Sequence, residues 1–346
     1  MIKREIELSI IVCAFNEEET IEKSIKKIFE QVGHNQSIET FIIDNESSDR
    51  TFQISQDIIS SIGFKNVSLV SINHCPLTHS RNTGLKLSNG KFIAYVDADG
   101  WIDKSWLKEV FLSISKDFDI CCGTIDISDN ADWFSKLIFN SHYKPSLLSS
   151  ESGLIGANMV FKKSVLSEAG GFHTVPTSRG DETLIHNILI EKNPDLKIIN
   201  NPNQKFVNSY VDNLTDWFKL QFLEGVSGGS FHRSKKPYSL IFHITIKLFS
   251  LFFIPALFLL FFTGLNAYLL LLILFGFIRH AARNKYYKQS ILYGLRAYKF
   301  YYLLVFPIIV LGSIPLDFGF IRGSLIGRSY LSSSAPPSEV VKTFKI

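Results

Sequence analysis

The stretch LSIIVCAFNEEETIEKSIKKIF, residues 8–29, contains the repeating unit from which we predict the fold. A β-branched apolar run is followed by a polar turn, and then by apolar residues at helical spacing. Apolar runs followed by polar turns return at residues 41–45 (FIIDN), 67–72 (VSLVSI) and 92–99 (FIAYVDAD). This alternation predicts an α/β domain, and the near-continuous apolar strands indicate a parallel sheet covered on both faces.

Polar side chains follow these strands at the points where they end. Asn16 and Glu17 come after the first run, Asp44 lies within the second, and Asp97 and Asp99 close the fourth. In open α/β sheets, ligands bind outside the carboxyl ends of the parallel strands. The sequence therefore predicts a binding site where these residues converge.

The fourth run ends in a group of carboxylates, Asp97, Asp99 and Asp103. Such close carboxylates repel one another, and burying them unpaired is costly unless a cation compensates their charge. One interpretation is a metal site, and the other is an Asp-rich, solvated turn. The chain lacks GxGxxG after its first strand and lacks GxxxxGK[ST], which disfavours dinucleotide and P-loop sites. Because Mg²⁺ binds through one or two carboxylates plus substrate phosphates, a metal here predicts a nucleoside diphosphate ligand.

Five segments occur in a characteristic order: SIIVCAFNEEETI, IIDNESSDRT, SRNTGLKLSNGKFIAYVDADG, GANMVFKKSVLSEAGGF and RGDETLI. With them the chain resembles the family 2 glycosyltransferases of the GT-A fold, from about residue 8 to about residue 230. The resemblance implies a GT-A type nucleotide-sugar-binding domain with a mostly parallel central sheet, and a UDP- or GDP-sugar as donor. The chain departs from the family at DNES (44–47), where two acids and a glycine are common, and at Lys104, where proline is common. These departures leave the identity of the base open.

The resemblance also assigns roles to single residues. It implies that Asp44 binds the uracil or guanine base or its ribose, and that Asp97 contacts the ribose or the donor sugar. It implies that Asp99 holds a divalent metal, Mn²⁺ or Mg²⁺.

Asn16, Glu17 and Arg81 are further candidates for binding the donor. The resemblance places the loop of Asn16 and Glu17 under the nucleotide, and the alternative interpretation is a turn that caps a helix. We expect Arg81 either to bind the diphosphate, as arginine does with two parallel hydrogen bonds, or to pair with the acidic cluster.

Asp181 and Glu182 open a predicted helix in SRGDETLI, where two acids are ordinary partners of the helix dipole. Sugar transfer with inversion needs a base within reach of the attacking hydroxyl. The family commonly has Glu-Asp here, with the aspartate as base. We therefore predict Asp181 as the catalytic base, with Glu182 as its neighbour or as a helix cap.

Charge divides the chain into two parts. Residues 1–224 contain 22 Lys+Arg and 30 Asp+Glu, whereas residues 225–346 contain 14 and 2. A basic part rich in Phe and Leu predicts membrane attachment with the basic residues on the anionic cytoplasmic face. A soluble domain with an apolar helical core is the alternative interpretation. Binding of nucleic acid is not expected, because apolar segments flank the basic, aromatic stretch.

The predicted organisation has three parts. Residues 1–236 form the GT-A glycosyltransferase domain. Residues 237–316 form a multi-pass membrane region, with a transmembrane hairpin at about 240–280, an interfacial helix at about 281–299 and a third apolar segment at about 300–315. Residues 317–346 form a tail that is partly disordered. The catalytic domain is expected on the cytoplasmic side.

The predicted function is a membrane-anchored, metal-dependent inverting glycosyltransferase. It passes one sugar to a hydroxyl of a lipid-linked or envelope-polysaccharide acceptor. Glu224 and Gly225 replace the Arg-Trp pair of processive relatives, which disfavours polymerisation. Two alternatives stay open, a polyprenyl-phosphate glycosyl synthase with a phosphate acceptor, and an inactive nucleotide-binding membrane scaffold.

Overall fold

The computed structural model describes residues 5–63, 66–143, 153–175, 179–211, 213–235, 314–325 and 334–345, and residues 244, 247 and 312. The chain divides into two compact units. The first comprises Met1–Ser128, Gly153–Asn208 and Leu331–Ile346, and the second comprises Asp129–Ser152 and Ser209–Tyr330. The second unit includes residues 129–143 and 209–235, which the sequence predicted as part of the domain over residues 1–236.

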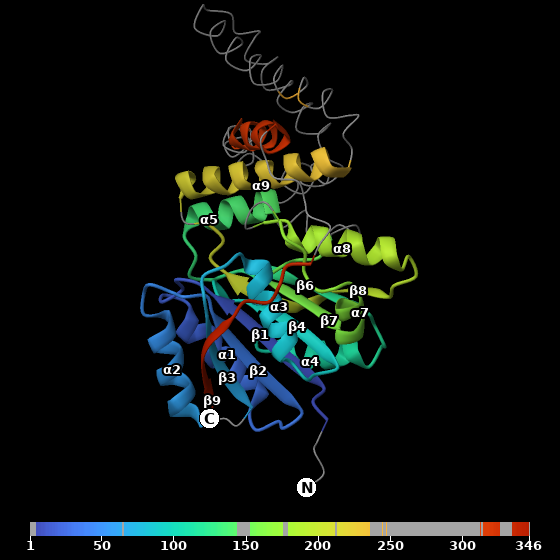
Figure 1. Cartoon of the computed structure of the whole chain (residues 1–346). Helices are drawn as coiled ribbons and strands as arrows, with labels where there is room; N and C mark the ends of the chain where they lie inside the picture. The colour runs from blue at the N-terminus through green and yellow to red at the C-terminus, as the bar shows by residue number, and fades with distance from the viewer. Residues whose placement is uncertain are drawn as a thin grey trace, which may run out of the picture. The chain divides into compact units, whose positions relative to one another are not determined.

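The first unit is built on a nine-stranded sheet in the order β5-β8-β6-β7-β4-β1-β2-β3-β9 (Figure 1). The strands are β1 (Leu8–Ala14), β2 (Ile38–Asp44), β3 (Val67–Ile72), β4 (Phe92–Asp97), β5 (Gly100–Ile102), β6 (Ile120–Ile127), β7 (Asn158–Lys162), β8 (Ile198–Asn208) and β9 (Val340–Lys345). Its helices are α1 (Ile21–Val32), α2 (Thr51–Ile62), α3 (Leu77–Leu87), α4 (Trp106–Ile114), α7 (Lys163–Glu168) and α8 (Asp181–Lys192).

The sheet is mixed rather than mostly parallel, which corrects the prediction. Strands β3, β2, β1 and β4 are parallel neighbours, as the repeating unit predicted. Beyond them β7 runs antiparallel to both β4 and β6, and β9 runs antiparallel to β3. The alternating pattern ends after β4, so the sequence had no signal for the direction of the later strands.

The parallel strands form the core of this unit. Leu8, Ile10, Ile11 and Val12 of β1 are fully buried, as expected for a strand covered on both faces. Gly84 brings α3 close to β1, because a Cβ at this position would lie 2.5 Å from Cγ2 of Ile11. Burial of the strands and the close approach of α3 together fix the strand ends and the residues of α3 near them.

Residues 334–345 belong to the first unit, although the sequence predicted a partly disordered tail at 317–346. Ser334 forms an isolated bridge with His173, and β9 adds to the sheet beside β3. Residues 314–325 are helical and belong to the second unit.

The described part of the second unit is helical. It contains α5 (Trp133–Ile138), a π-helix η1 (Phe139–Tyr143), α9 (Leu214–Lys235) and the helix over residues 314–325. Phe134 and Ile138 of α5 pack on Val211 and Trp217 in a small apolar cluster. This packing explains why α9 and α5 group together, although they are distant in the sequence.

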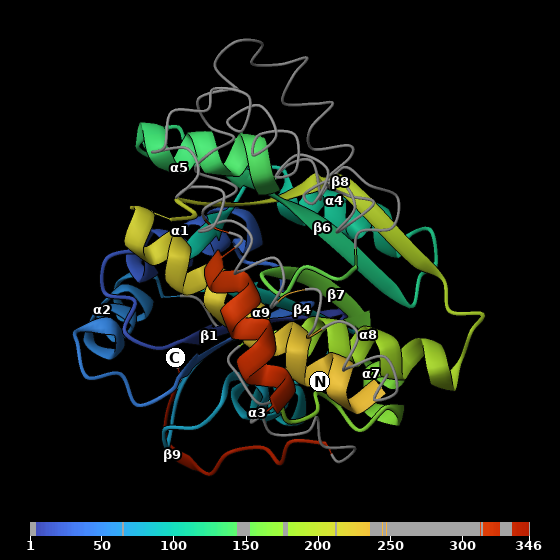
Figure 2. The same ribbon diagram turned by 90° about the horizontal axis from the view of Figure 1, so that it is seen from above.

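The helix over residues 314–325 lies across α9 at reciprocal glycines (Figures 1 and 2). A Cβ at Gly229 would lie 2.1 Å from the carbonyl oxygen of Phe320, and a Cβ at Gly323 would lie 2.1 Å from that of Val226. Ser324 donates a hydrogen bond to the Gly229 carbonyl at 3.4 Å. The two backbones are therefore in direct contact, a form of packing that pairs of small residues four apart allow.

Lys247 is the charged residue that interrupts the first predicted membrane span. Its Nζ lies 2.8 Å from Oδ1 of Asp317, which is fully buried, and 4.4 Å from the centre of the Phe320 ring. The charge of Lys247 is thus neutralised within the second unit.

No helix among the described residues is both long enough and apolar enough to cross a membrane. The predicted hairpin at 240–280, interfacial helix at 281–299 and third apolar segment at 300–315 lie almost entirely outside the described residues.

The glycine contact predicts opposite effects of one substitution at adjacent positions. Gly229→Ala should lower the melting temperature of the full chain, because overpacking a close contact costs about 1–3 kcal/mol. Gly228→Ala should leave it unchanged or raise it by up to about 1 kcal/mol in helix propensity, because its Cβ would meet only Cδ2 of Phe320 at 3.8 Å. Equal melting temperatures for the two variants would contradict the reciprocal glycine contact.

Candidate active site

Three parallel strands bring the predicted residues to one edge of the sheet. Ala14 at the end of β1 pairs in register with Asp44 of β2, and Cys13 pairs with Asp97 of β4. The loop with Asn16 and Glu17 follows β1 directly. The carboxyl ends of β1, β2 and β4 are therefore level, which sets the acidic side chains around a common point.

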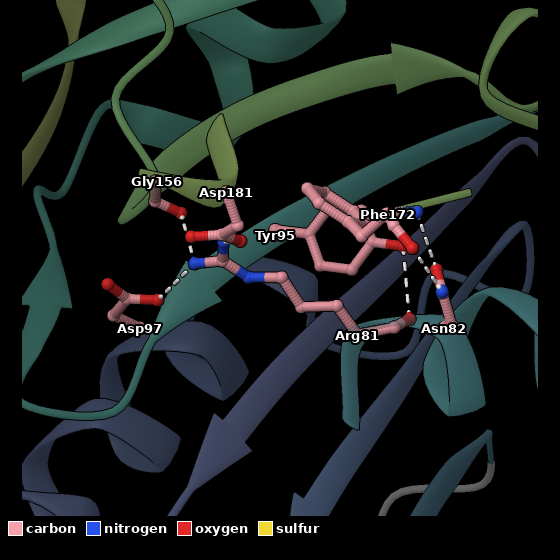
Figure 3. Close-up of polar contacts among 7 residues, drawn as sticks. All are labelled: Arg81, Asn82, Tyr95, Asp97, Gly156, Phe172 and Asp181. Atoms are coloured by element: carbon pink, nitrogen blue, oxygen red, sulfur yellow. Dashed lines mark hydrogen bonds and ion pairs between the residues drawn. The ribbon is translucent and has the colours of Figure 1, made fainter. Parts of the chain in front are cut away.

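Arg81 of α3 lies at the centre of this region (Figure 3). Its Nη1 pairs with Oδ2 of Asp181, and its Nη2 lies 3.1 Å from Oδ1 of Asp97. Nη2 also donates a hydrogen bond to the carbonyl oxygen of Gly156 at 3.1 Å. The Arg81 side chain is only 2% exposed, so one guanidinium joins β4, α8 and the segment before β7 inside the protein.

The charges around Arg81 stabilise one another. Burial alone would lower the pKa of the guanidinium, but the carboxylates of Asp181 and Asp97 outweigh it and hold the pKa above its ordinary value. Removing one member of such a buried pair leaves an uncompensated charge and typically costs about 3–5 kcal/mol. Of the two expected roles of Arg81, the structure supports the pairing with the acidic cluster.

Asp44 is the clearest candidate for a ligand contact. Its side chain is buried, and Oδ2 accepts a hydrogen bond from the Ser47 backbone N–H at 3.4 Å. Oδ1 is buried and has no hydrogen-bond partner among the described residues. Burial raises the pKa of the Asp44 carboxyl. A buried acceptor without a donor is costly, so this atom is suited to a donor that a ligand brings.

The two loops next to Asp44 are held together by side chains. Asn16 has a positive φ of 55°, a conformation that asparagine tolerates better than most residues. Its Oδ1 accepts from the Ser48 backbone N–H at 2.8 Å, and Asp49 accepts from the backbone N–H groups of Glu18 at 3.1 Å and Thr51 at 2.9 Å. In this structure Asn16 and Asp49 shape the loops, and a direct contact of Asn16 with donor stays a prediction.

Asp97, Asp99 and Glu17 form the acidic side of the site. Thr20 connects the loop of Glu17 to residues 97–99. Its hydroxyl shares one proton between the Ala98 carbonyl at 2.9 Å and Glu17 Oε2 at 3.0 Å. Asp99 keeps contact with solvent, but desolvation by surrounding protein atoms, followed by the negative charges of Asp97 and Glu17, raises its pKa to about 7. Burial raises the pKa of Glu17 as well. A cation beside Asp99 would relieve this repulsion.

The described residues contain no group of three or more His, Cys, Asp or Glu side chains that could hold a metal ion by themselves. Asp97 is already engaged by Arg81, which leaves Asp99 as the exposed carboxylate of the pair. This donor set fits a hard cation that takes one or two carboxylates from the protein and its other oxygens from phosphate and water.

Asp103, the third carboxylate of the cluster seen in the sequence, does not join the site. Its Oδ1 accepts from the backbone N–H of Ser105 at 3.1 Å and from its hydroxyl at 2.9 Å, just before α4 begins. For Asp103 the interpretation as an Asp-rich turn is therefore correct.

Glu182 is more central to the site than the sequence indicated. A Cβ added to Gly156 would lie 3.2 Å from Arg81 Nη2 and 3.6 Å from Glu182 Oε2, so the carboxylate lies beside the guanidinium. Burial, followed by the negative charge of Asp181, raises the pKa of Glu182 to about 8. The acidic pair at the start of α8 was visible in the sequence, but the division of roles within it depends on Arg81.

Comparison with known proteins finds a family that matches the first half of the chain. The family described as "Glycosyl transferase family 2" matches residues 9–170. The match covers just under half of the chain, and this segment resembles a family 2 glycosyltransferase domain; we call it the family 2 domain. It contains Asp44, Arg81, Asp97 and Asp99, whereas Asp181 and Glu182 follow it in the chain.

Curated relatives match parts of this chain. Dolichyl N-acetyl-alpha-D-glucosaminyl phosphate 3-beta-D-2,3-diacetamido-2,3-dideoxy-beta-D-glucuronosyltransferase of Methanococcus voltae is 27% identical over 113 residues, 32% of this chain and 35% of that protein. UDP-Glc:alpha-D-GlcNAc-diphosphoundecaprenol beta-1,3-glucosyltransferase WfaP of Escherichia coli is 33% identical over 95 residues, 27% of this chain and 36% of that protein. The matches thus span about a third of each relative.

A solved structure shares the fold over most of the chain. The mannosyltransferase PcManGT from Pyrobaculum calidifontis, in complex with GDP-Man and Mn²⁺, superposes with a TM-score of 0.60. The two proteins are 17% identical, and the match covers 93% of this chain and 88% of the other. The likeness shows a GT-A-like α/β fold.

The geometry of the family 2 domain predicts opposite stability effects at two aspartates. The pKa of Asp44 is raised in the folded state, so its contribution to stability is lost as the pH rises through that pKa, and its charge is destabilising at neutral pH. Hydrogen bonds, chiefly from Thr51, outweigh desolvation and lower the pKa of Asp49, so its charge is stabilising there and that stability is lost on acidification.

We therefore expect Asp44→Asn to keep or raise the melting temperature at pH 7.5 while weakening binding of nucleotide. Asp49→Asn, the matched control, should lower the melting temperature. Thermal unfolding and calorimetric titration with UDP and GDP measure the two properties separately. A fall in melting temperature for Asp44→Asn with unchanged nucleotide affinity would contradict the role of Asp44.

Proposed function

We propose that the protein is a membrane-anchored, metal-dependent inverting glycosyltransferase that moves one sugar from a nucleoside diphosphate sugar to a hydroxyl of a lipid-linked or polysaccharide acceptor. The observation that carries the proposal is the meeting of Asp44, with its unpaired buried oxygen, and the Asp97–Asp99 pair at the carboxyl ends of parallel strands. A family 2 domain over residues 9–170 supports the reaction class.

Asp44 supports uracil as the base of the donor. One oxygen of its carboxylate is already bound to the Ser47 N–H, which leaves one acceptor for the ligand. Uracil offers a single ring N–H between two carbonyl groups, whereas guanine offers two adjacent donors that suit a carboxylate with both oxygens free. A UDP-sugar is therefore the preferred donor and a GDP-sugar the second candidate.

Asp99 would hold the divalent cation, Mn²⁺ or Mg²⁺, with Asp97 beside it. When bound, the cation supplies positive charge to the departing diphosphate. Arg81 does not touch the donor in this proposal. It fixes Asp97 in place and leaves Asp99 as the carboxylate that faces the ligand.

We assign the base to Glu182 in place of Asp181. A proton on Asp181 would break its buried ion pair with Arg81, whereas Glu182, whose side chain is hydrogen-bonded to Asp181, forms no ion pair among the described residues. In the transfer, the bond from the anomeric carbon to the diphosphate breaks, the acceptor oxygen forms the new bond, and its proton passes to Glu182. A positioned base contributes about 10²–10⁴-fold to such a step.

Several features support the proposed membrane anchor and the proposed class of acceptor. WfaP is named for a diphosphoundecaprenol-linked acceptor, and the Methanococcus protein for a dolichyl phosphate-linked one. In the second unit, the reciprocal glycines of α9 and residues 314–325 are typical of helices in apolar surroundings. Exposed large apolar side chains also occur there: Trp133, Leu214, Phe318 and Leu325. Residues 237–316 would form the anchor, with the catalytic unit at the cytoplasmic face.

The function is tested by a donor screen. UDP-, GDP-, CMP- and dTDP-sugars are incubated with the full chain, Mn²⁺ and lipid extract, and both released nucleotide and glycosylated lipid are measured. Release from a UDP-sugar that depends on the extract is the expected result. If no donor releases nucleotide with any extract while UDP still binds, the inactive-scaffold alternative holds.

Metal dependence gives the first prediction for activity. EDTA should abolish turnover, and Mn²⁺ or Mg²⁺ should restore it. Asp99→Asn should lower turnover at least about a hundredfold, the usual scale for losing charge stabilisation of a leaving group. Asp103→Asn is the matched control, because the Asp103 carboxylate only accepts hydrogen bonds from Ser105 in the turn before α4, and the turnover of this variant should stay near that of the wild type. Full activity in EDTA would exclude the metal.

The two acids of α8 give the second prediction. Glu182→Gln should keep the melting temperature and UDP affinity but lose turnover, together with the rise of kcat with pH that ends near the pKa of Glu182, about 8. Asp181→Asn should lower the melting temperature, because it breaks the ion pair with Arg81.

The acceptor decides how strongly Glu182→Gln acts. A phosphate acceptor is already ionised and needs no base, so much of the rate would survive. Wild-type turnover of Glu182→Gln on a hydroxyl acceptor would remove Glu182 from the mechanism.

A further inference from the structure

The amide side chain of Asn82, the residue after Arg81, ties together two distant segments. Its Oδ1 accepts a hydrogen bond from the Phe172 backbone N–H at 2.8 Å, and its Nδ2 donates to the Phe172 carbonyl at 2.8 Å. Nδ2 also donates to the carbonyl of Ala335 at 2.6 Å. All three contacts are buried, so the amide is fully used by backbone groups, and Figure 3 shows the two contacts with Phe172.

Residues 334–338, which we call the strap, run along α3 in both views (Figures 1 and 2). Ala335 is 2% exposed, and its N–H donates to the Phe172 carbonyl at 2.8 Å. The Ser338 N–H donates to Oγ1 of Thr83 at 2.7 Å. The strap thus contacts two consecutive residues of α3 and the backbone of Phe172, and it leads into β9.

Phe172 connects the strap to the candidate active site. Its ring lies under the guanidinium of Arg81, with 5.3 Å between the ring centre and Cζ, and it packs edge-on against Tyr95 at 5.1 Å. The Tyr95 hydroxyl donates to the Arg81 carbonyl at 3.2 Å. A shift of Phe172 would therefore reach the guanidinium that holds Asp97 and Asp181.

The turn that carries Phe172 follows α7, where the Gly170 N–H donates to the Ser167 carbonyl and the Gly171 N–H donates to the Leu166 carbonyl, each at 2.9 Å. Gly170 and Gly171 have φ values of 84° and 76°, and a Cβ at Gly171 would lie 2.4 Å from Oδ1 of Asn82. Beyond this turn, Asn82 and the strap bind the backbone of Phe172 itself, through both its N–H and its carbonyl.

We propose that the strap and Asn82 are positioning elements of the active site, which hold Phe172 against Arg81 and thereby set Asp97 and Asp181 for the reaction. The strap follows the second unit in the chain, so the family 2 domain gains its working geometry from a segment more than 160 residues beyond its matched range. Of the two measurements that test this proposal, turnover rests on the proposed function, whereas hydrogen exchange does not.

The test compares two deletions in the full chain. Deletion of residues 334–346 removes the strap and β9, whereas deletion of residues 340–346 removes β9 alone and is the matched control. Both are assayed well below their melting temperatures. Without the strap, kcat should fall about ten- to a hundredfold, the scale on which a displacement of about 1 Å acts, while the KM for the donor changes little. Without β9 alone, kcat should stay within about threefold of the wild type.

Hydrogen exchange measures the docking without any activity. The peptide containing Phe172 should lose protection when residues 334–346 are deleted and keep it when residues 340–346 are deleted. A synthetic peptide of residues 334–346 added in trans should restore protection and kcat to the longer deletion. The same peptide with Ala335→Asp should restore neither, because it places a charge at a buried site.

Two results would overturn the proposal. One is a normal kcat for the deletion of residues 334–346, in a protein that is folded at the assay temperature. The other is unchanged protection of Phe172 in that variant. If instead no variant transfers any sugar but protection changes as expected, the proposed function fails and the docking of the strap stands.

Discussion

The geometry of the site depends on one buried interaction, the guanidinium of Arg81 between Asp181 and Asp97. Each partner comes from a different part of the chain: Arg81 from α3, Asp97 from the end of β4, and Asp181 from the first turn of α8. A buried charge must be paired with good geometry, so this contact fixes where three elements meet. The Gly156 carbonyl and the ring of Phe172 complete the surroundings of Arg81.

The same interaction places the four carboxylates of the site in two different environments. Arg81 binds Asp97 and Asp181, and it leaves Asp99 and Glu182 in a crowded, negative environment where the pKa of each is raised, to about 7 and about 8. Raised carboxylate pKa values mark places where a cation or a proton is taken up. Asp44 adds a buried oxygen without a partner on the side of β2. Under the proposed function, the protein would supply acceptors and negative charge, and the ligand with its metal would supply hydrogen-bond donors and positive charge.

The second unit follows a different packing rule. Its described helices meet through backbone contact at glycines, with serine hydroxyls on carbonyl groups, rather than through large interlocking side chains. Helices packed in this way need no aqueous hydrophobic effect to associate, since close contact over a long stretch supplies the attraction. The buried ion pair of Lys247 and Asp317 neutralises two charges within the second unit, as the ion pairs of Arg81 do in the first unit.

The sequence by itself determined the parallel half of the sheet, since β-branched runs and helical spacing are local signals that each strand and each helix carries in its own residues. It also located Asp44, Asp97 and Asp99, because polar residues at the ends of buried strands have few structural reasons to be there. It could not separate Asp103 from its neighbours, because a tight turn and a metal site use the same side chain. It could not foresee the antiparallel strands, the return of residues 334–345 to the sheet or the ion pair between Arg81 and Asp181, whose residues are 100 positions apart. Those features rest on contacts between distant segments, and only the packed chain decides which charges meet.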